Sequence, residues 1–293
     1  GTGMTEDGKP AVVVFAKNDV LAKQAAIPVA IEDTPVRVRV IGEVRAFQGP
    51  PGGGGGVDPT ARFPRPVPIG VSTGHPAITA GTIGCRVTDG TNVFALSNNH
   101  VYAATNFEDC AANEPLWSCA LGDPVIQPGT FDGGVTPDDD IGNVVDFEPI
   151  LFDGSDNTID AAIASTTTSL VGNSTPADGY GTPKSGTGVV AFVRQNVKKY
   201  GRTTGLTSSK VSVINATVNV NYGDPGVATF VNQIVIRGGS FSAGGDSGSL
   251  IVQDGGADDL EPVGLLFAGS NSSTIANPIG LVLDRFNVTV DGQ

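Results

Sequence analysis

Gly244-Gly245-Asp246-Ser247-Gly248-Ser249 is the stretch that decides the fold of this chain. It places one serine in a glycine-rich turn between two segments rich in β-branched residues. Glycine reaches backbone angles that are closed to other residues, so the amide groups of such a turn can converge on one point and hold a developing oxyanion. The same composition is also typical of an ordinary polar turn. Whether this serine is a nucleophile therefore depends on a base and an acid elsewhere in the chain.

The chain has 2 histidines, His75 and His100, and both precede Ser247. An α/β-hydrolase is excluded because its histidine follows the serine, and the fifth position of its serine motif is Ser249 here rather than glycine. His100 lies at the end of an apolar segment, residues 94–101, from which an imidazole can point into a cleft. His75 stands in a turn beside Pro76, and we interpret it as a surface or capping histidine.

Asp160 is the best candidate for the acid because it begins a short apolar segment, residues 160–164, where a carboxylate can be buried beside an imidazole. The run from Asp138 to Asp140 is interpreted as a solvated loop. The resulting order of histidine, aspartate and serine is that of chymotrypsin, whereas subtilisin places the aspartate first.

At these residues the chain resembles the chymotrypsin-like (trypsin-like) serine peptidases, and most of all their bacterial streptogrisin and α-lytic protease branch. The resemblance covers roughly residues 69–290. Three blocks around the histidine, the acid and the serine carry it: residues 96–101, 158–164 and 244–249. Further segments follow the second barrel of that branch in order: residues 200–205, 213–218, 262–269 and 278–290. It implies a mainly β fold of two six-stranded antiparallel β-barrels.

The resemblance also implies roles for single residues. Ser247 would be the nucleophile, His100 the general base, and Asp160 the group that orients the imidazole. The backbone N–H groups of Gly245 and Ser247 would form the oxyanion hole. Asp246 would be a structural acid. In many members of the family a newly cut N-terminal amine pairs with this acid, but here about 70 residues precede the barrels. We therefore expect Asp246 to pair with an internal cation or donor.

Three positions depart from the family pattern. Val101 replaces the cysteine that usually follows the histidine, and Ser249 replaces a second glycine. Phe241 stands where trypsin members carry the acid of the specificity pocket. The wall of that pocket would be formed by Phe267, Ala268 and Gly269. The sequence therefore predicts a preference for a small or apolar side chain at the P1 position of a substrate.

The composition and the positions of glycine and proline divide the chain into four parts. Residues 1–48 are expected to form a small α+β module of β-α-β type, with strands at 11–16 and 36–41 and a helix near 19–25. Residues 49–68 are a linker rich in glycine and proline. Residues 69–170 are assigned to the first barrel, and residues 171–293 to the second, which would be closed by a helix at 279–286 and a last strand at 287–290.

The formal net charge of −13 argues against nucleic acid or an anionic membrane as a partner. The sequence has no run of 18 apolar residues, so it predicts no membrane span. The expected partner is a polypeptide substrate, with no cofactor and no metal, and the acidic turn at residues 153–157 is interpreted as solvated. The N-terminal module is a candidate surface for homo-oligomerisation.

The 3 cysteines leave the redox compartment open. Cys85 lies in an apolar segment and is expected to be buried, whereas Cys110 and Cys119 are either bridged or free. Gly1-Thr2-Gly3 before Met4 resembles an expression remnant. The protein is expected to be cytoplasmic if Met4 is the native start, and secreted if a leader has been removed.

Two functions of different class remain open from sequence. One is a serine endopeptidase acting through an acyl-enzyme, with a less favoured variant in which the same site serves an esterase-like acyl transferase. The other is a catalytically silent binding or scaffold protein of the peptidase fold, gated by its N-terminal module.

Overall fold

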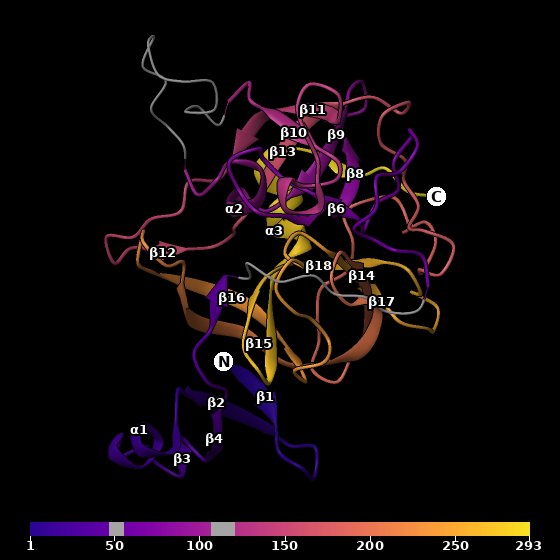
Figure 1. Ribbon diagram of the computed structural model, residues 1–293. Coiled ribbons are helices and arrows are strands. Elements are labelled where there is room, and N and C mark those ends of the chain that lie inside the picture. Colours follow the sequence, from indigo (N-terminus) through magenta and orange to yellow (C-terminus); the bar gives the residue numbers. More distant parts are fainter. Residues whose placement is uncertain (47–55, 107–120) are drawn as a thin grey trace.

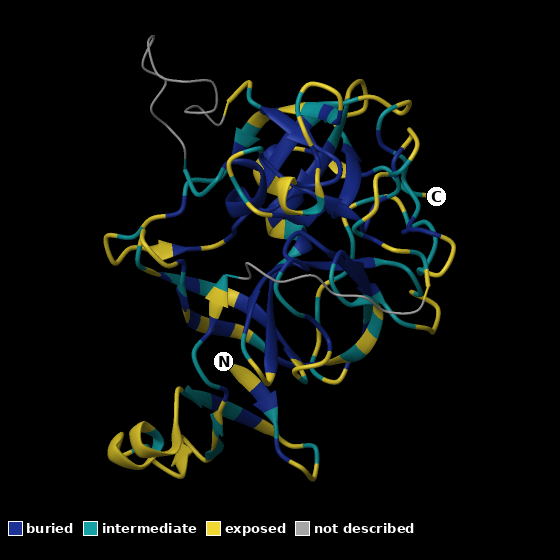
Figure 2. Ribbon diagram, in the orientation of Figure 1, coloured by how far each residue is buried: buried dark blue, intermediate teal, exposed yellow. Residues whose placement is uncertain are grey.

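A computed structural model of the chain describes residues 1–46, 56–106 and 121–293. Two β-barrels lie one above the other in Figure 1, and the first part of the chain forms a small module beneath the second barrel. Burial is concentrated inside the two barrels, whereas much of the module is exposed (Figure 2). The predicted mainly β fold of two barrels is therefore confirmed.

The first barrel is a six-stranded sheet in the order β10-β11-β13-β9-β8-β20. Its strands are short and rich in β-branched and small apolar residues, which suit a curved sheet with a filled interior. They span β8 (Cys85–Thr88), β9 (Val93–Ser97), β10 (Pro124–Ile126), β11 (Asp140–Phe147), β13 (Ala162–Thr166) and β20 (Thr289–Val290). Beside them lie the β6–β7 pair (Ser72–Thr73, Gly81–Thr82), helix α2 (Asn99–Tyr102) and the 3-10 turn η1 (Thr130–Asp132).

The second barrel is closed by pairing between β15 and β16. In β15 the side chains of Val218 and Val220 are buried, whereas the neighbouring Thr217 and Asn219 are exposed, as the alternating sequence predicts. The six strands of this barrel span β14 (Asn196–Gly201), β15 (Gly205–Asn221), β16 (Val227–Arg237), β17 (Leu250–Gln253), β18 (Pro262–Gly269) and β19 (Ser273–Pro278). The two-residue β12 (Asp156–Asn157) adds to the edge of β16 in parallel.

The C-terminal segment crosses back to the first barrel, although the sequence assigned it to the second. Helix α3 (Ile279–Phe286) has the predicted bounds, and its apolar face packs into a cluster made mostly by the first barrel. Strand β20 then pairs with β8, with Val290 opposite Val87. Sequence spacing predicts the helix but not the surface on which it packs.

The N-terminal module consists of β1 (Thr2–Met4), β2 (Pro10–Ala16), α1 (Asp19–Gln24), β3 (Ala30–Ile31), β4 (Thr34–Val40) and β5 (Arg45–Ala46). Strands β2 and β4 pair in parallel with α1 between them. Thr2 of β1 pairs with Ile214 of β15, so the module is joined to the second barrel by strand pairing. No residue of α1 is buried, which fits its exposed position in Figure 2.

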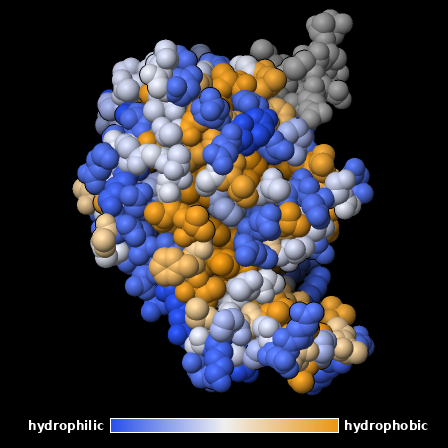
Figure 3. Space-filling model, turned by 180° about the vertical axis from the view of Figure 1, so that it is seen from behind, coloured by the Kyte–Doolittle hydropathy of each residue, from blue (hydrophilic) through white to orange (hydrophobic). Residues whose placement is uncertain are grey.

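Apolar side chains gather on the back of the molecule (Figure 3). No helix in the described ranges is both long enough and apolar enough to cross a membrane. Cys85 is buried in β8, as predicted, whereas Cys110 and Cys119 fall outside the described residues.

Candidate active site

His100 lies in the first turn of α2, directly after β9. Its Nδ1 is 2.6 Å from Oδ2 of Asp160, and its backbone N–H donates to Oδ1 of the same carboxylate. Both side chains are almost fully buried. Because Nδ1 faces a carboxylate, the ring proton belongs there and Nε2 carries the lone pair. This Nε2 is buried and has no hydrogen-bond partner among the residues that the structure describes.

Asp160 is held in place by groups from both barrels. Asn98 donates its side-chain amide to the Asp160 carbonyl at 2.7 Å, and the Asp160 N–H donates to Oδ1 of Asn277 at 3.1 Å. Tyr222 donates its hydroxyl to Oδ2 of Asp160 at 2.8 Å. Asp160 is therefore fixed by three further hydrogen bonds, two at its backbone and one, from Tyr222, at the carboxylate that faces His100.

Tyr222 is a site residue that the sequence did not reveal. Its ring lies edge-on to the His100 imidazole, with the centroids 6.0 Å apart. Burial, and then the Asp160 charge, raise the pKa of Tyr222 well above its usual value, so the hydroxyl remains a donor. The alternation of Val218, Val220 and Tyr222 predicts that this side chain points inward. Only the meeting of the two barrels places it beside Asp160.

Ser247 lies in the turn between β16 and β17, where the two barrels touch. Its hydroxyl donates to the carbonyl of Phe267 at 3.3 Å, and its own carbonyl accepts from the Thr82 N–H at 2.8 Å. A Cβ added to Gly81 would meet the side chain of Val101 at 2.5 Å and the Ser247 carbonyl at 3.1 Å. The strand β7 is thus a thin layer between the serine turn and the residue that follows His100.

Glycine is required at two positions of the serine turn. Gly245 and Gly248 have φ angles of 94° and 93°, which side-chain-bearing residues rarely adopt. A Cβ at Gly248 would lie 2.2 Å from the Thr82 carbonyl, and one at Gly245 would lie 2.5 Å from the Thr203 hydroxyl. Both glycines let the turn press against its neighbours without a clash, which fixes the position of Ser247.

Asp246 is fully buried and pairs with an internal cation, as expected from the sequence. Nζ of Lys199 lies 3.3 Å from its Oδ2. The carboxylate also accepts the backbone N–H groups of Thr203, Thr204 and Ala243, and the Thr204 hydroxyl. Burial lowers the pKa of Lys199, and Asp246 acts in the opposite direction. Lys199 of the same chain therefore supplies the charge partner of this acid.

A second buried ion pair joins the barrels behind the serine turn. Arg202 of the second barrel donates from Nε to Asp132 of the first at 2.8 Å. Its side chain also lies under Gly245, because a Cβ there would come within 2.9 Å of the Arg202 Cδ. No local pattern predicts this pair, since the two residues are 70 positions apart.

His75 and Asp139 also have definite partners. His75 is buried, accepts the Ala77 N–H at Nδ1 and contacts Asp123 through Nε2 at 2.8 Å, so it is a capping histidine. The sequence predicted that Asp139 lies in a solvated loop. That prediction is wrong for this side chain, because Asp139 is 5% exposed and pairs with Arg62.

The residues predicted to form the specificity pocket fall in different places. Phe241 is buried in an apolar cluster inside the second barrel. Phe267 and Ala268 are buried in a second cluster that also contains Val44 of the module. Gly269 lines a cavity of about 560 Å³ next to the serine turn, whose other walls are residues 239, 242–244 and 270–271, together with residues 42, 43, 45 and 46 of the module.

Neither a family model nor a curated protein matches this sequence. Among solved structures, the chain is similar to a glutamic acid specific serine protease, with 23% identity and a TM-score of 0.52 over 76% of this chain and 100% of the other. It is also similar to Protease A of Thermobifida fusca, with 18% identity and a TM-score of 0.51 over 78% of this chain and 100% of the other. This chain therefore has the fold of the bacterial chymotrypsin-like serine proteases.

Proposed function

We propose that this protein is a serine endopeptidase that hydrolyses peptide bonds through Ser247, His100 and Asp160. The observation that carries the proposal is the 2.6 Å contact between His100 Nδ1 and Asp160, which leaves a buried Nε2 without a partner among the described residues. An imidazole oriented in this way is prepared to accept a proton from a nearby hydroxyl. The glycine turn at the barrel junction supplies that hydroxyl.

The proposed reaction has two halves. Ser247 Oγ attacks the scissile carbonyl carbon while its proton moves to His100 Nε2, and Asp160 stabilises the resulting imidazolium. The oxyanion is received by the N–H groups of Gly245 and Ser247. His100 then gives the proton to the leaving amine as the C–N bond breaks, which leaves an acyl-enzyme. Water attacks the ester with His100 again as base, and the acid product leaves Ser247 free.

Covalent labelling tests the nucleophile. We expect a small fluorophosphonate to modify the intact protein at Ser247, as located by mass spectrometry, and to leave the Ser247→Ala variant unmodified. The matched control is Ser249→Ala in the same turn, whose hydroxyl donates to the Asp246 carbonyl at 2.6 Å and has no proposed chemical role. Labelling that persists in Ser247→Ala, or that is absent from the wild-type protein, would contradict the proposal.

We further propose a preference for small or apolar P1 residues. The barrel residues that line the cavity beside the serine turn are glycine, serine, alanine and asparagine, so none of them carries a charge. The similar glutamic acid specific protease is described as using a histidine triad in substrate binding. In this chain His75 and His100 both lie in the first barrel and each already faces an aspartate.

A peptide library varied at P1 measures this preference. We expect Ala, Val, Leu or Phe to give higher kcat/KM values than Lys, Arg or Glu, because a charged side chain would lose its hydration in this cavity and the barrel residues that line it offer no charge partner. Faster cleavage after Lys, Arg or Glu would show that the pocket has been assigned wrongly.

The second candidate is a binding or scaffold protein whose peptide site is filled by its own module. It is favoured by one specific observation, the pairing of β5 with β18. Peptide turnover together with labelling of Ser247 would exclude it.

A further inference from the structure

The edge of β18 beside Ser247 is occupied by another strand of the same chain. The register between β17 and β18 ends at Leu265, so β17 does not cover the last part of β18. There β5 pairs with β18 in antiparallel fashion, with Ala46 opposite Ala268 and Arg45 opposite Gly269. An exposed sheet edge next to a reactive serine is where an extended peptide would add as a strand.

The direction of β5 is that of a peptide approaching the nucleophile. From Arg45 to Ala46 the strand passes from Gly269 to Ala268. The next residue of β18 in that direction is Phe267, whose carbonyl accepts the Ser247 hydroxyl. β5 therefore lies where the acyl portion of a substrate would lie, with its carboxyl end directed toward Ser247.

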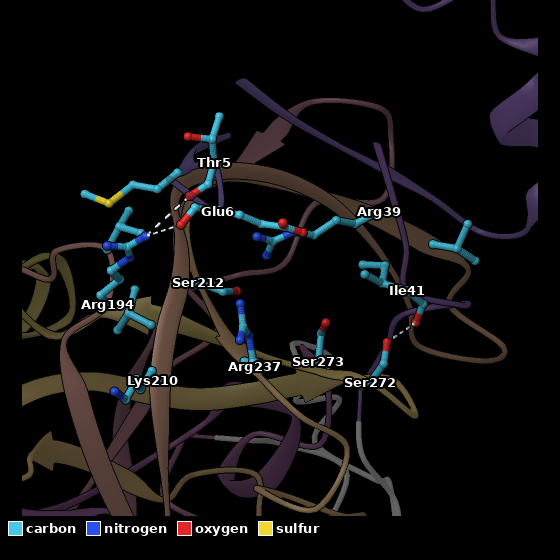
Figure 4. A pocket seen from close by; sticks show the side chains of 14 residues that line it. Thr5, Glu6, Arg39, Ile41, Arg194, Lys210, Ser212, Arg237, Ser272 and Ser273 are labelled. Atoms are coloured by element: carbon cyan, nitrogen blue, oxygen red, sulfur yellow. Dashed lines mark hydrogen bonds between the residues drawn. The ribbon is translucent and has the colours of Figure 1, made fainter. Parts of the chain in front are cut away.

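Residues 41–44, which precede β5, contact the second barrel through both side chains and backbone carbonyls. The side chains of Ile41 and Val44 are buried in the cluster that contains Phe267. The Val44 carbonyl accepts the Asn221 N–H at 3.0 Å. The Ile41 carbonyl accepts from the hydroxyl of Ser272 at 3.3 Å (Figure 4). Several contacts along the segment therefore hold it in the cleft.

Glu43 adds electrostatic contacts on the exposed side. Its carboxylate lies 3.2 Å from Nζ of Lys17 and 2.6 Å from the Arg45 guanidinium, and it accepts from Asn221 at 3.3 Å. Arg45, Lys17 and Asn221, in that order, lower the pKa of Glu43 to about 2. The carboxylate thus remains ionised at neutral pH and links the module to the barrel.

The joint between module and barrel also contains a repulsive element. Arg39 of the module, and Lys210 and Arg237 of the barrel, line a cavity of about 770 Å³ (Figure 4). Arg194 of the barrel lines it too, but donates to the carbonyls of Thr5 and Glu6 in the module. Burial, and then the neighbouring Arg237, lower the pKa of Arg39. Like charges that face each other across the joint oppose docking. Repulsion among Arg39, Lys210 and Arg237 therefore opposes the contacts that hold the module.

We propose that residues 42–46 are a resident occupant of the acyl-side peptide site, so that the protein is latent toward extended peptides until this segment is displaced. The inference rests on the proposed function and adds its regulation. A strand tethered to the same molecule competes at an effective concentration on the order of 1 mM. If the strand binds with an intrinsic Kd of about 0.1 mM, the apparent affinity and kcat/KM of a competing peptide are then lowered about tenfold.

The test compares two alanine-to-proline variants in two-residue strands of the module. Ala46→Pro removes a backbone donor from β5, and the control Ala30→Pro makes the same change in β3, which pairs only with β4. We expect Ala46→Pro to raise kcat/KM for an extended tetrapeptide amide about tenfold, and Ala30→Pro to leave it unchanged. Labelling by the small fluorophosphonate, which does not need the β18 edge, should be equal in all three proteins.

A binding measurement keeps the inference separate from catalysis. A fluorescent peptide of sequence Gly-Glu-Val-Arg-Ala, equivalent to residues 42–46, is titrated against Ser247→Ala and against the Ser247→Ala, Ala46→Pro double variant. We expect about tenfold tighter binding to the double variant. Equal binding would overturn the inference, even if the enzyme is active. A binding difference without any labelling of the wild-type protein would instead overturn the proposed function alone.

Thermal unfolding checks that the variants are folded. If Ala46→Pro fails to fold, Glu43→Lys replaces it, because it sets a third cation beside Lys17 and Arg45. Its control is Glu32→Lys, an exposed position of the module. The expected gains in peptide hydrolysis and binding are the same, and their absence in a folded Glu43→Lys protein would show that β5 is a permanent strand of the barrel.

Discussion

The His100→Ala variant is expected to lose about 10⁴-fold or more of kcat toward a small activated ester, because the proton of Ser247 then has no oriented acceptor. A small ester reaches the serine without the β18 edge, so the measurement does not depend on the state of the module. The residual rate would come from the oxyanion hole and from substrate binding. Stopped-flow or steady-state assays with a chromogenic ester provide the measurement.

His75→Ala is the matched control, because each histidine is buried and each faces an aspartate. The loss of the His75 cap on the Ala77 N–H and of its contact with Asp123 should lower the free energy of unfolding by about 1–3 kcal/mol. Its kcat should remain within severalfold of wild type. A comparable loss of kcat in both variants would mean that the effect is structural and that His100 is not the base.

Lys199→Met is expected to lower the free energy of unfolding by about 3 kcal/mol, because it leaves the buried Asp246 without its cation. The effect should lie at the low end of the range for broken buried pairs, since four hydrogen-bond donors still face the carboxylate. The melting temperature should fall by about 5 °C. Because Asp246 adjoins Ser247, fluorophosphonate labelling should slow as well.

The neighbouring residue supplies the control for this variant. Lys198 pairs with Asp259 and Asp254 at the surface, at 2.9 Å and 3.4 Å. Lys198→Met should therefore change stability by less than about 1 kcal/mol. Equal losses in the two variants, measured by denaturant unfolding, would refute a special role for the buried pair.

Much of the fold follows from local pattern. Period-two alternation marks β15, because one face of a barrel strand meets the apolar interior and the other does not. The apolar residues from Ile279 to Phe286 recur at helical spacing and so give the bounds of α3, because one face of this helix is buried and the other is not. No periodic pattern in the sequence shows on which surface α3 packs. The sequence therefore did not predict that β20, the strand after α3, pairs with β8 of the first barrel.

The candidate site divides in the same way. The order of His100, Asp160 and Ser247 can be read from the sequence because each residue stands at the end of a strand or in a turn of recognisable type. Their supporting groups cannot. Tyr222 reaches Asp160 from the other barrel, and Lys199 reaches Asp246 from a neighbouring strand. Such contacts join residues far apart in sequence, and no periodicity encodes them.

By itself the sequence determined a β-rich chain with a glycine-bounded serine turn, since burial pattern and turn chemistry act over a few residues, and its resemblance to the chymotrypsin-like peptidases implied the two β-barrels. Only the tertiary structure decided what surrounds that serine. It set Asp246 against Lys199, and it placed β5 on the open edge of β18. The physical reason is that an unpaired strand edge accepts many partners, and main-chain hydrogen bonding does not depend on the side chains that a sequence displays.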